Sequence, residues 1–363
     1  MKFNRINTFY KNKKILIIGH TGFKGTWLTL CLKNLGSKIY GISIDVPTKP
    51  SHYKLTKIAN KINDFRIDIR NYNEFKKKVL KIKPDIIFHF AAQSLVKESF
   101  KDPHKTWSTN LMGSINLLEI LKNSNFLKKT SVVIITSDKC YKNVNQRKGY
   151  VENDMLGDYE PYGASKAAVE LAFHSYFDSF FKKRKNLRMA TARAGNVIGG
   201  GDWSKDRVVP DLIKSLKSKQ ILKIRYPNST RPWQHVLEPI YGYMHLALNL
   251  YLGKKNTNGE SFNFGPKFLK NYKVTELLIK LKEYIPQIKW KIDTKKKKVH
   301  EAGLLNLNCV KSFKILQWKN ILTFNETAEM TAEWYNRYLK KENVEKITLN
   351  QINNYKIKLE KNK

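Results

Sequence analysis

Acidic residues are scarce in this chain. Only 30 of its 363 residues are Asp or Glu, whereas 68 are Lys or Arg, which gives a formal charge of +38 at pH 7. The basic residues are mostly lysines scattered over the whole length, without a stripe interleaved with arginines and stacking aromatics, so the charge by itself does not indicate nucleic-acid binding. We expect an acidic small-molecule substrate and a solvated lysine surface, with no nucleic-acid partner.

Cysteines and long apolar runs are also few. The three cysteines are Cys31, Cys140 and Cys309, and no two of them have the spacing of a metal site. The first apolar run, Ile15 to Ile18, is too short for a signal sequence or a membrane span. The sequence therefore favours a reducing, cytoplasmic setting and predicts no metal and no membrane partner.

Hydrophobic residues make up 41% of the chain, which is enough for a sizeable core. Short β-branched runs alternate with stretches whose apolar residues have helical spacing. Parallel strands need helical crossovers, so this alternation predicts an α/β fold, a Rossmann-type doubly wound parallel sheet. The predicted strands are 15–18, 39–44, 85–91, 131–136 and 187–193, and the predicted helices are 26–35, 106–122 and 161–181.

The character of the sequence changes after Arg193, where glycines and Pro-rich turns become frequent. We divide the chain into a dinucleotide-binding domain (1–194), a smaller α/β substrate-binding lobe that partly crosses back into the first domain (195–340), and a lysine-rich C-terminal tail (341–363). The tail is expected to be a frayed helix with a solvation role.

A glycine turn separates the first predicted strand from the first predicted helix. It reads G-x-x-G-x-x-G over residues 19–25. A diphosphate needs backbone N–H groups at close range and the positive end of a helix, and side chains at the glycine positions would block both. We therefore expect a dinucleotide diphosphate to be bound by Gly19, Thr21, Gly22, Phe23, Lys24 and Gly25.

The position that distinguishes NAD from NADP is ambiguous. An acidic residue is expected at the end of the second strand, but that position is Ser43, and the nearest carboxylate is Asp45. NAD with Asp45 at the adenosine ribose is favoured, and Arg70 as a partner of an NADP phosphate is the alternative. Asp68, followed by Ile69, is placed to accept a hydrogen bond from the adenine amino group, unless it only caps its loop.

A tyrosine and a lysine stand four residues apart at a predicted helix start, in Tyr162-Gly163-Ala164-Ser165-Lys166. Both side chains project from one helix face. We expect the ammonium to lower the pKa of the phenol, which can then remove a proton from a hydroxyl while hydride leaves for a nicotinamide. The strand that ends in Thr136-Ser137-Asp138-Lys139 delivers further polar groups to the same edge of the sheet.

Taken together, these motifs resemble the extended short-chain dehydrogenase/reductase family. Within that family, residues 20–25, 136–141 and 230–236 are similar to CDP-glucose 4,6-dehydratases. The matches run from about Phe9 to Trp318. The stretches that carry the family resemblance are Gly19 to Gly25, Phe90 to Ser94, Asn110, Ser137 to Lys139, Tyr162 to Lys166 and Arg193 to Val197.

The resemblance implies NAD as cofactor and CDP-glucose as substrate. It implies oxidation at C4, loss of water across C5 and C6, and return of the hydride to C6. Tyr162 would be the C4 base, Lys166 would hold the ribose, Ser137 would bond the C4 oxygen and Asp138 would protonate the departing C6 hydroxyl. Phe90, Ala91, Ala92 and Thr109 would join Tyr162 and Lys166 around the cofactor.

Lys139 departs from the pattern of the dTDP-glucose relatives, which have a glutamate that removes the C5 proton. A lysine can act as that base only when neutral, which requires its pKa to fall by several units. Lys139 is expected to be the C5 base, and electrostatic stabilisation of the enolate is the alternative.

The second lobe should offer arginines and amides to a nucleoside diphosphate. Arg225, Arg231 and His235 lie in one turn-rich segment. The resemblance implies that Arg231 binds the diphosphate and that Asn196 lies beside the sugar-linked phosphate, whereas exposed arginines on a solvated loop are the alternative. The further expected substrate contacts are Gln93, Ser94 and Arg193.

Rival functions share part of this machinery. A nucleotide-sugar 4-epimerase would use the glycine turn, Tyr162 and Lys166 but needs neither an acid at C6 nor a base at C5. A dehydratase of another nucleotide hexose, an NADPH-dependent reductase and a basic nucleic-acid-binding scaffold are further alternatives. The resemblance also implies a homodimer formed by the helices predicted over 107–121 and 161–181.

Overall fold

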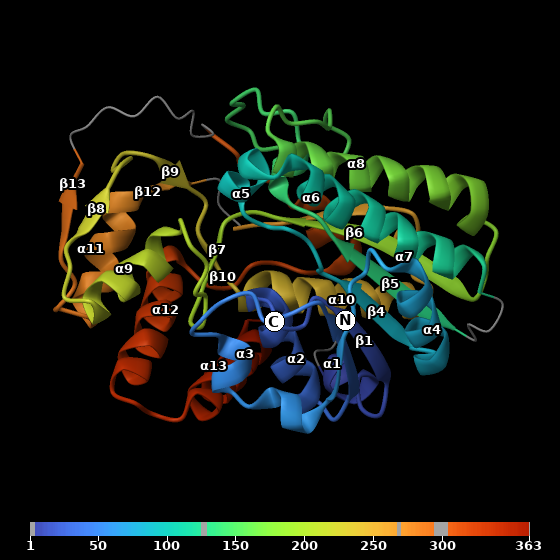
Figure 1. The fold of residues 1–363 in the computed structure, drawn as a ribbon, viewed down its shortest axis with the longest axis horizontal. Coiled ribbons are helices and arrows are strands. Elements are labelled where there is room, and N and C mark those ends of the chain that lie inside the picture. The colour runs from blue at the N-terminus through green and yellow to red at the C-terminus, as the bar shows by residue number, and fades with distance from the viewer. Residues whose placement is uncertain (1–3, 125–128, 267–269, 294–303, 363) are drawn as a thin grey trace.

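The computed structural model describes residues 4–124, 129–266, 270–293 and 304–362. Its centre is a seven-stranded sheet in the order β11-β6-β5-β4-β1-β2-β3, and every neighbouring pair is parallel (Figure 1). This confirms the predicted Rossmann-type sheet. The strands are β1 (Lys14–Ile18), β2 (Lys38–Ser43), β3 (Asn63–Arg66), β4 (Ile86–His89), β5 (Thr130–Ile135), β6 (Leu187–Ala194) and β11 (Ser261–Phe264).

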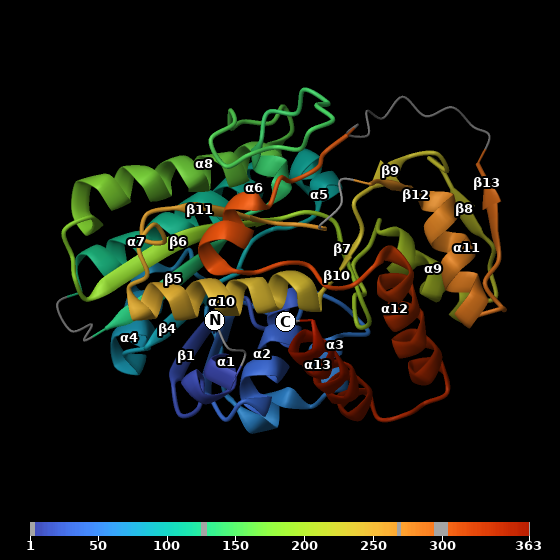
Figure 2. The same cartoon turned by 180° about the vertical axis from the view of Figure 1, so that it is seen from behind.

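Helices cover both faces of the sheet because successive strand residues point to opposite sides. Leu16 and Ile18 of β1 pack in one cluster with α4 (Tyr72–Ile82), α7 (Gly113–Lys122) and α8 (Pro161–Tyr176). Ile15 and Ile17 belong to the opposite cluster, with α2 (Phe23–Asn34) and α10 (Leu237–Leu252). Figure 2 shows the α2 and α10 ribbons on this side of the sheet. Both faces of this sheet are therefore buried.

The two long helices that the sequence predicts are present and continue through π-helical turns. The first runs from α6 (Pro103–Trp107) through η2 (Ser108–Met112) into α7, and the second from α8 into η4 (Phe177–Phe181). The remaining short helices of this domain are α1 (Asn4–Phe9), α3 (His52–Leu55), η1 (Ile58–Lys61), α5 (Val96–Lys101) and η3 (Asp138–Cys140).

The smaller lobe packs beside the carboxyl edge of the sheet (Figure 1). The chain returns from it to the first domain, because α10 lies under the sheet and β11 pairs with β6. No described helix is both long and apolar enough to cross a membrane. The elements of the lobe and its junction are β7 (Val197–Ile198), α9 (Val208–Lys217), β8 (Leu222–Ile224), β9 (Thr230–Arg231), β10 (Gln234–His235), β12 (Tyr272–Lys273), α11 (Val274–Tyr284), β13 (Trp290–Ile292), η5 (Ser312–Leu316) and α12 (Phe324–Leu339).

The expectation of a frayed, solvating C-terminal tail is wrong. Residues Val344–Lys361 form helix α13, which packs against α2, α3 and α12. Ile347, Ile352 and Tyr355 are buried, and the Tyr355 hydroxyl donates to the Glu238 carboxylate at 2.8 Å. The apolar residues of this segment recur at helical spacing, which makes an amphipathic helix despite the lysine- and asparagine-rich composition.

Candidate active site

The predicted catalytic and cofactor-binding segments meet at the carboxyl edge of the sheet. The glycine turn follows β1, residues 90–92 follow β4, η3 follows β5, and α8 starts beside η3. A Cβ atom added to Gly163 of α8 would lie 2.6 Å from the Lys139 carbonyl oxygen, so the two segments are in direct contact. This edge is where α/β sheets bind their ligands.

The glycine turn has the shape that a diphosphate needs. Gly22 is the N-cap of α2 and no side chain caps the first N–H groups of this helix. A Cβ on Gly25 would come within 2.2 Å of the Gly19 carbonyl oxygen, and one on Gly19 within 2.6 Å of the Ala91 nitrogen. Only glycines permit this close packing, which leaves the positive end of α2 available to an anion. The turn therefore fits a dinucleotide.

A hydrogen-bonded network that the sequence did not predict supports the turn. The ring of His20 bridges the Ser43 hydroxyl, at 2.9 Å, and the Asp64 carboxylate, at 2.7 Å. Although burial raises the pKa of Asp64, hydrogen bonds from His20 and the Tyr53 hydroxyl hold it at about 2. Asp45 is exposed, and its backbone carbonyl accepts the Thr21 hydroxyl at 2.6 Å. The predicted ribose ligand thus lies beside the turn.

Asp68 and Arg70 are paired with each other. The Asp68 carboxylate accepts the Arg70 backbone N–H at 2.9 Å and its guanidinium at 2.6 Å. Ile69 is buried against Gly113. Asp68 therefore caps its loop, and Arg70, the alternative partner of an NADP phosphate, is already engaged by a carboxylate.

The residues predicted around the nicotinamide lie between β4 and α8. Phe90, Ala91 and Ala92 follow β4 directly and are partly buried, and Thr109 lies in η2, which contacts α8. The Asn110 amide donates to the Ser165 hydroxyl at 2.8 Å and so connects η2 to α8.

Ser137 and Asp138 are buried and lie beside the partly buried Tyr162. The Ser137 hydroxyl donates to the Asp138 carboxylate at 2.9 Å and also hydrogen-bonds the Tyr162 phenol. Burial raises the pKa of Asp138 above its usual range, against the opposing charges of Lys139 and Lys24. Burial makes this carboxyl group a weaker acid than an exposed one, which suits a general acid.

The expected lowering of the Tyr162 pKa by Lys166 is wrong for this structure. Burial raises the pKa of Tyr162 to about 12, and the hydrogen bond from Ser137 only partly offsets it. Lys166 is itself buried, which lowers its pKa to about 8, and its ammonium donates to the Ile135 carbonyl at 3.2 Å. Loss of hydration at the phenol outweighs the charges around it.

The start of α8 is fixed by a residue that the sequence reasoning missed. The Glu160 carboxylate caps the helix by accepting the backbone N–H groups of Tyr162 and Gly163, each at 2.8 Å. The acidic residue directly before Pro161 was the sequence signal for this cap.

Lys139 is partly buried near three carboxyl groups, those of Asp138, Asp158 and Glu160. Burial raises the pKa of each of these carboxyl groups, and the charge of Lys139 lowers it.

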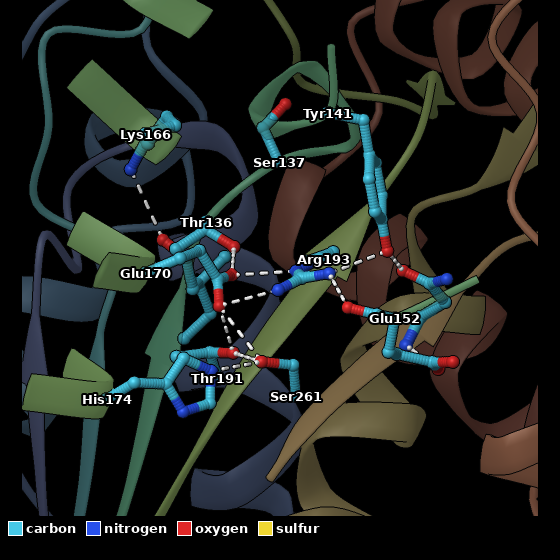
Figure 3. A network of polar contacts seen from close by, with 12 residues as sticks. Thr136, Ser137, Tyr141, Glu152, Lys166, Glu170, His174, Thr191, Arg193 and Ser261 are labelled. Carbon is cyan, nitrogen blue, oxygen red and sulfur yellow. Dashed lines mark hydrogen bonds and ion pairs between the residues drawn. The ribbon is translucent and has the colours of Figure 1, made fainter. Parts of the chain in front are cut away.

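Arg193 is not a substrate contact, and that expectation is wrong. It is 1% exposed on β6 and pairs with Glu170 of α8 through two N–H···O bonds of 3.0 Å (Figure 3). Its remaining nitrogen donates to the Tyr141 hydroxyl at 2.7 Å and the Glu152 carbonyl at 2.9 Å. A guanidinium whose three nitrogens all have internal acceptors has nothing left for a ligand.

His235 is also misassigned as a substrate ligand. Its side chain is 0% exposed, accepts the Leu237 backbone N–H at 3.3 Å and lies edge-on to the Trp27 ring. Burial lowers its pKa to about 3. His235 is therefore a neutral core residue between the two lobes.

The other predicted substrate contacts have mixed surroundings. The Gln93 amide bonds Leu95 in its own loop and the Thr106 hydroxyl of α6, whereas Ser94 is exposed. In the smaller lobe, Arg225 is exposed and lies 3.7 Å from Asp206, and partly buried Arg231 donates to the Thr230 carbonyl at 2.7 Å. Asn196 is partly buried, and its backbone carbonyl accepts the Gln234 N–H.

One arginine was missed at the junction between the carboxyl edge of the sheet and the smaller lobe, here called the crevice. Arg207, at the N-terminus of α9, faces Tyr162 from the smaller lobe and lowers the pKa of that phenol. It pairs with the buried Asp202 carboxylate at 2.9 Å. The sequence signal was a basic residue directly before an apolar helix start.

Among the described residues, no group of three or more His, Cys, Asp or Glu side chains could hold a metal ion.

Comparison with known proteins agrees with this geometry. The profile of the GDP-mannose 4,6 dehydratase family matches residues 16–331. The chain belongs to this family. CDP-glucose 4,6-dehydratase from Salmonella typhimurium is 38% identical over 354 residues, which cover 96% of this chain and 97% of that protein. The chain is accordingly an enzyme of the nucleotide-sugar 4,6-dehydratase class, a hydro-lyase.

Solved structures show the same fold. The epimerase Mth375 from Methanothermobacter thermautotrophicus aligns with a TM-score of 0.78 at 21% identity and covers 94% of this chain and 98% of its own. The dTDP-glucose 4,6-dehydratase from Bacillus anthracis, solved in complex with NAD, aligns with a TM-score of 0.71 at 19% identity and covers 90% and 98%.

Proposed function

We propose that this enzyme converts CDP-glucose to CDP-4-keto-6-deoxyglucose with NAD as its cofactor. The observation that carries the proposal is the 38% identity to a CDP-glucose 4,6-dehydratase along almost the full length of both chains. The crevice supports it, because Ser137, Asp138 and Tyr162 lie together beside Lys166 at the carboxyl edge of the sheet.

NAD fits the first domain. When bound, NAD accepts a hydride from C4 of the sugar and returns it to C6. The uncapped N-terminus of α2 would hold the diphosphate, and Asp45, beside the turn, would accept the hydroxyls of the adenosine ribose and repel the phosphate of NADP. The loop of Asp68 and Ile69 would lie at the adenine, and residues 90–92 with Thr109 would lie at the nicotinamide.

Tyr162 would take the proton of the 4-hydroxyl. The hydrogen bond between Ser137 and the phenol favours the phenolate, and Arg207 acts in the same direction from the smaller lobe. Lys166 would hold the nicotinamide ribose. Water exclusion by the second lobe would strengthen these interactions, because charges act more strongly in a medium of low dielectric constant.

The elimination needs an acid and a base. Asp138, whose pKa burial raises, would give its proton to the departing 6-hydroxyl, which leaves as water. Lys139, next along η3, would accept the proton from C5 as the C5–C6 double bond forms. Asp138 and Lys139 are successive residues of η3, so one short turn would supply both the acid and the base.

The smaller lobe would bind the nucleoside diphosphate. Arg207, Arg225 and Arg231 present guanidinium groups on this lobe, and Asn196 lies at its junction with the sheet. Guanidinium groups match phosphate oxygens in charge and geometry. Of the three arginines, Arg207 faces the catalytic tyrosine, so the sugar-linked phosphate would lie nearest to it.

The function is tested by incubating the full-length enzyme with CDP-, dTDP-, UDP- and GDP-glucose, with and without added NAD. We expect CDP-glucose to give the alkaline absorbance of a 4-keto-6-deoxy sugar, at a rate at least tenfold above the other three. Formation of UDP-galactose from UDP-glucose, with no product from CDP-glucose, would establish the epimerase alternative instead.

Replacement of Lys139 by methionine tests the C5 base. The variant should still oxidise C4, because Tyr162 and Ser137 remain, but exchange of the C5 hydrogen with deuterated water should slow by about a hundredfold or more. Mass spectrometry of the recovered sugar nucleotide measures that exchange. Lys142→Met, on the exposed chain after η3, is the matched control. Unchanged exchange in the Lys139 variant would remove it from the base role and leave the electrostatic one.

A homodimer is also proposed, formed by the long helices α6–α7 and α8. These helices expose the large apolar side chains of Trp107 and Leu171, and η4, which continues α8, exposes Phe180. Exposed apolar side chains on adjacent helices favour a partner. Light scattering should give twice the chain mass of 42.4 kDa, and Leu171→Glu should shift it toward the monomer. A monomeric wild-type protein at micromolar concentration would contradict the dimer.

A further inference from the structure

Asp202 is a buried carboxylate at the junction of the two lobes, and the proposed reaction gives it no role. It is 3% exposed and lies between β7 and α9. One carboxylate oxygen, Oδ1, accepts the backbone N–H of Ser204 at 3.0 Å, and the other, Oδ2, accepts the Nη1 group of Arg207 at 2.9 Å. A buried carboxylate is stable as an anion only where such partners replace water. The carboxylate is therefore fixed within its own loop, and it fixes the arginine in turn.

The backbone around Asp202 is held by elements of both lobes. The Trp27 indole of α2 donates to the Gly200 carbonyl at 2.9 Å, and the Tyr335 hydroxyl of α12 donates to the carbonyl of Asp202 itself at 2.6 Å. A Cβ atom on Gly200 would lie 2.0 Å from the Trp334 ring, so α12 packs directly on this segment. Trp27, Trp334 and Tyr335 are all fully buried. The backbone of Asp202 is thus fixed relative to both lobes.

The other end of the same loop lies against the first domain. Asp206 forms an ion pair with Lys97 of α5, and α5 packs against α8. The Ser99 hydroxyl of α5 donates at 3.3 Å to Glu160, the carboxylate that caps the start of α8. Arg207 directly follows Asp206 in the chain. These contacts therefore place Arg207 near the N-terminal end of α8.

Part of the Arg207 guanidinium is not used inside the protein. Asp202 engages Nη1, and within the described part of the chain no other group accepts a hydrogen bond from Arg207. The Arg207 side chain is 39% exposed. Arg193 differs, because all three of its nitrogens have internal acceptors. Nε and Nη2 of Arg207 remain as a fork of two donors, which is the geometry that matches two oxygens of a phosphate.

We propose that Asp202 is a positioning residue for the sugar nucleotide, which holds Arg207 so that the free fork of its guanidinium meets the substrate diphosphate. An arginine without this partner would have to lose the freedom of its side-chain torsions when the substrate binds, and that loss lowers affinity. The carboxylate also cancels part of the positive charge, which acts in the opposite direction. The inference rests on the proposed sugar-nucleotide site but not on the nucleotide base or on the cofactor.

The sign of the change in KM separates these two effects of Asp202. In Asp202→Asn the amide keeps the volume of the side chain but loses the charge that holds the guanidinium. We expect KM for the sugar nucleotide to rise about tenfold and kcat to stay within about twofold, because the arginine binds a diphosphate that the reaction does not change. Removal of a carboxylate that only balances charge would lower KM instead, and that result would overturn the proposal.

Arg207→Met provides the second test, because Asp202 is proposed to act through Arg207. This variant should raise KM about tenfold or more, and the addition of Asp202→Asn to it should cause no further rise. Effects of the two changes that multiply would overturn the proposal, as would an unchanged KM in Arg207→Met. Glu283→Gln is the matched control, because the exposed Glu283 pairs with Lys280 on α11 of the same lobe, and this variant should leave KM unchanged.

Folding and substrate identity are controlled separately. Tyr335→Phe removes only the hydroxyl that holds the Asp202 carbonyl, so it should raise KM in the same direction but less, and it replaces Asp202→Asn if that variant does not fold. Calorimetry should give the wild-type dissociation constant of NAD for every variant, and a parallel loss of NAD affinity would overturn the proposal as a general loosening of the junction. The kinetics use whichever of CDP-, dTDP-, UDP- and GDP-glucose the wild type converts. A preference for another base would therefore count against the proposed substrate and not against Asp202.

Discussion

The buried ion pair between Glu170 and Arg193 is the interaction on which the catalytic geometry depends. It joins α8 to β6, and Glu170 also accepts the hydroxyls of Thr136, directly after β5, and of Ser261 on β11. Charges buried this deeply are tolerated only when their hydrogen-bonding groups are satisfied, which here requires all four elements to hold one arrangement. Figure 3 shows these side chains converging on the two charged groups.

This arrangement places the catalytic helix. Glu170 lies one helical turn beyond Lys166, so the pair holds the first half of α8 against the end of β5, where Ser137 follows. Glu160 fixes the other end of the same segment by capping the helix at Tyr162. The tyrosine, the lysine and the serine are thus positioned by contacts that a substrate never touches.

Burial has one common effect on the crevice. It raises the pKa of Asp138 and Tyr162 and lowers the pKa of Lys166 and Lys24, which favours the neutral form of every one of these groups. Because these four groups are poorly hydrated, their pKa values respond strongly to the charges of a bound dinucleotide and sugar nucleotide. The net charge of +38 on the whole chain attracts the same anionic ligands.

Much of the fold could be predicted because it depends on local pattern. The strand, turn and helix at Ile15 to Leu35 and the positions of Tyr162 and Lys166 follow from periodicity and from the residues that a diphosphate tolerates. Two of the failures concern burial. From the sequence alone, the polar residues Arg193 and His235 could be taken for ligand contacts. Only the packing of β6 and α10 shows that both side chains are buried.

Two other failures have different causes. Helix α13 was misjudged because its lysine and asparagine content was weighed above the spacing of its apolar residues. Arg207 was missed because its approach to Tyr162 depends on how the second lobe closes over the first, a relation between distant segments that local pattern does not contain. The pKa of Tyr162 depends in the same way on the depth of the crevice.

A double-mutant cycle on the ion pair tests the central claim most directly. Urea unfolding gives the free energy of unfolding for Arg193→Met, Glu170→Met and the double variant. Each single change should lower it by about 3–5 kcal/mol, because it leaves one buried charge without a partner, and the double change should lower it by less than the sum. Losses that simply add would contradict the account, since α8 would then be held to the sheet by other contacts.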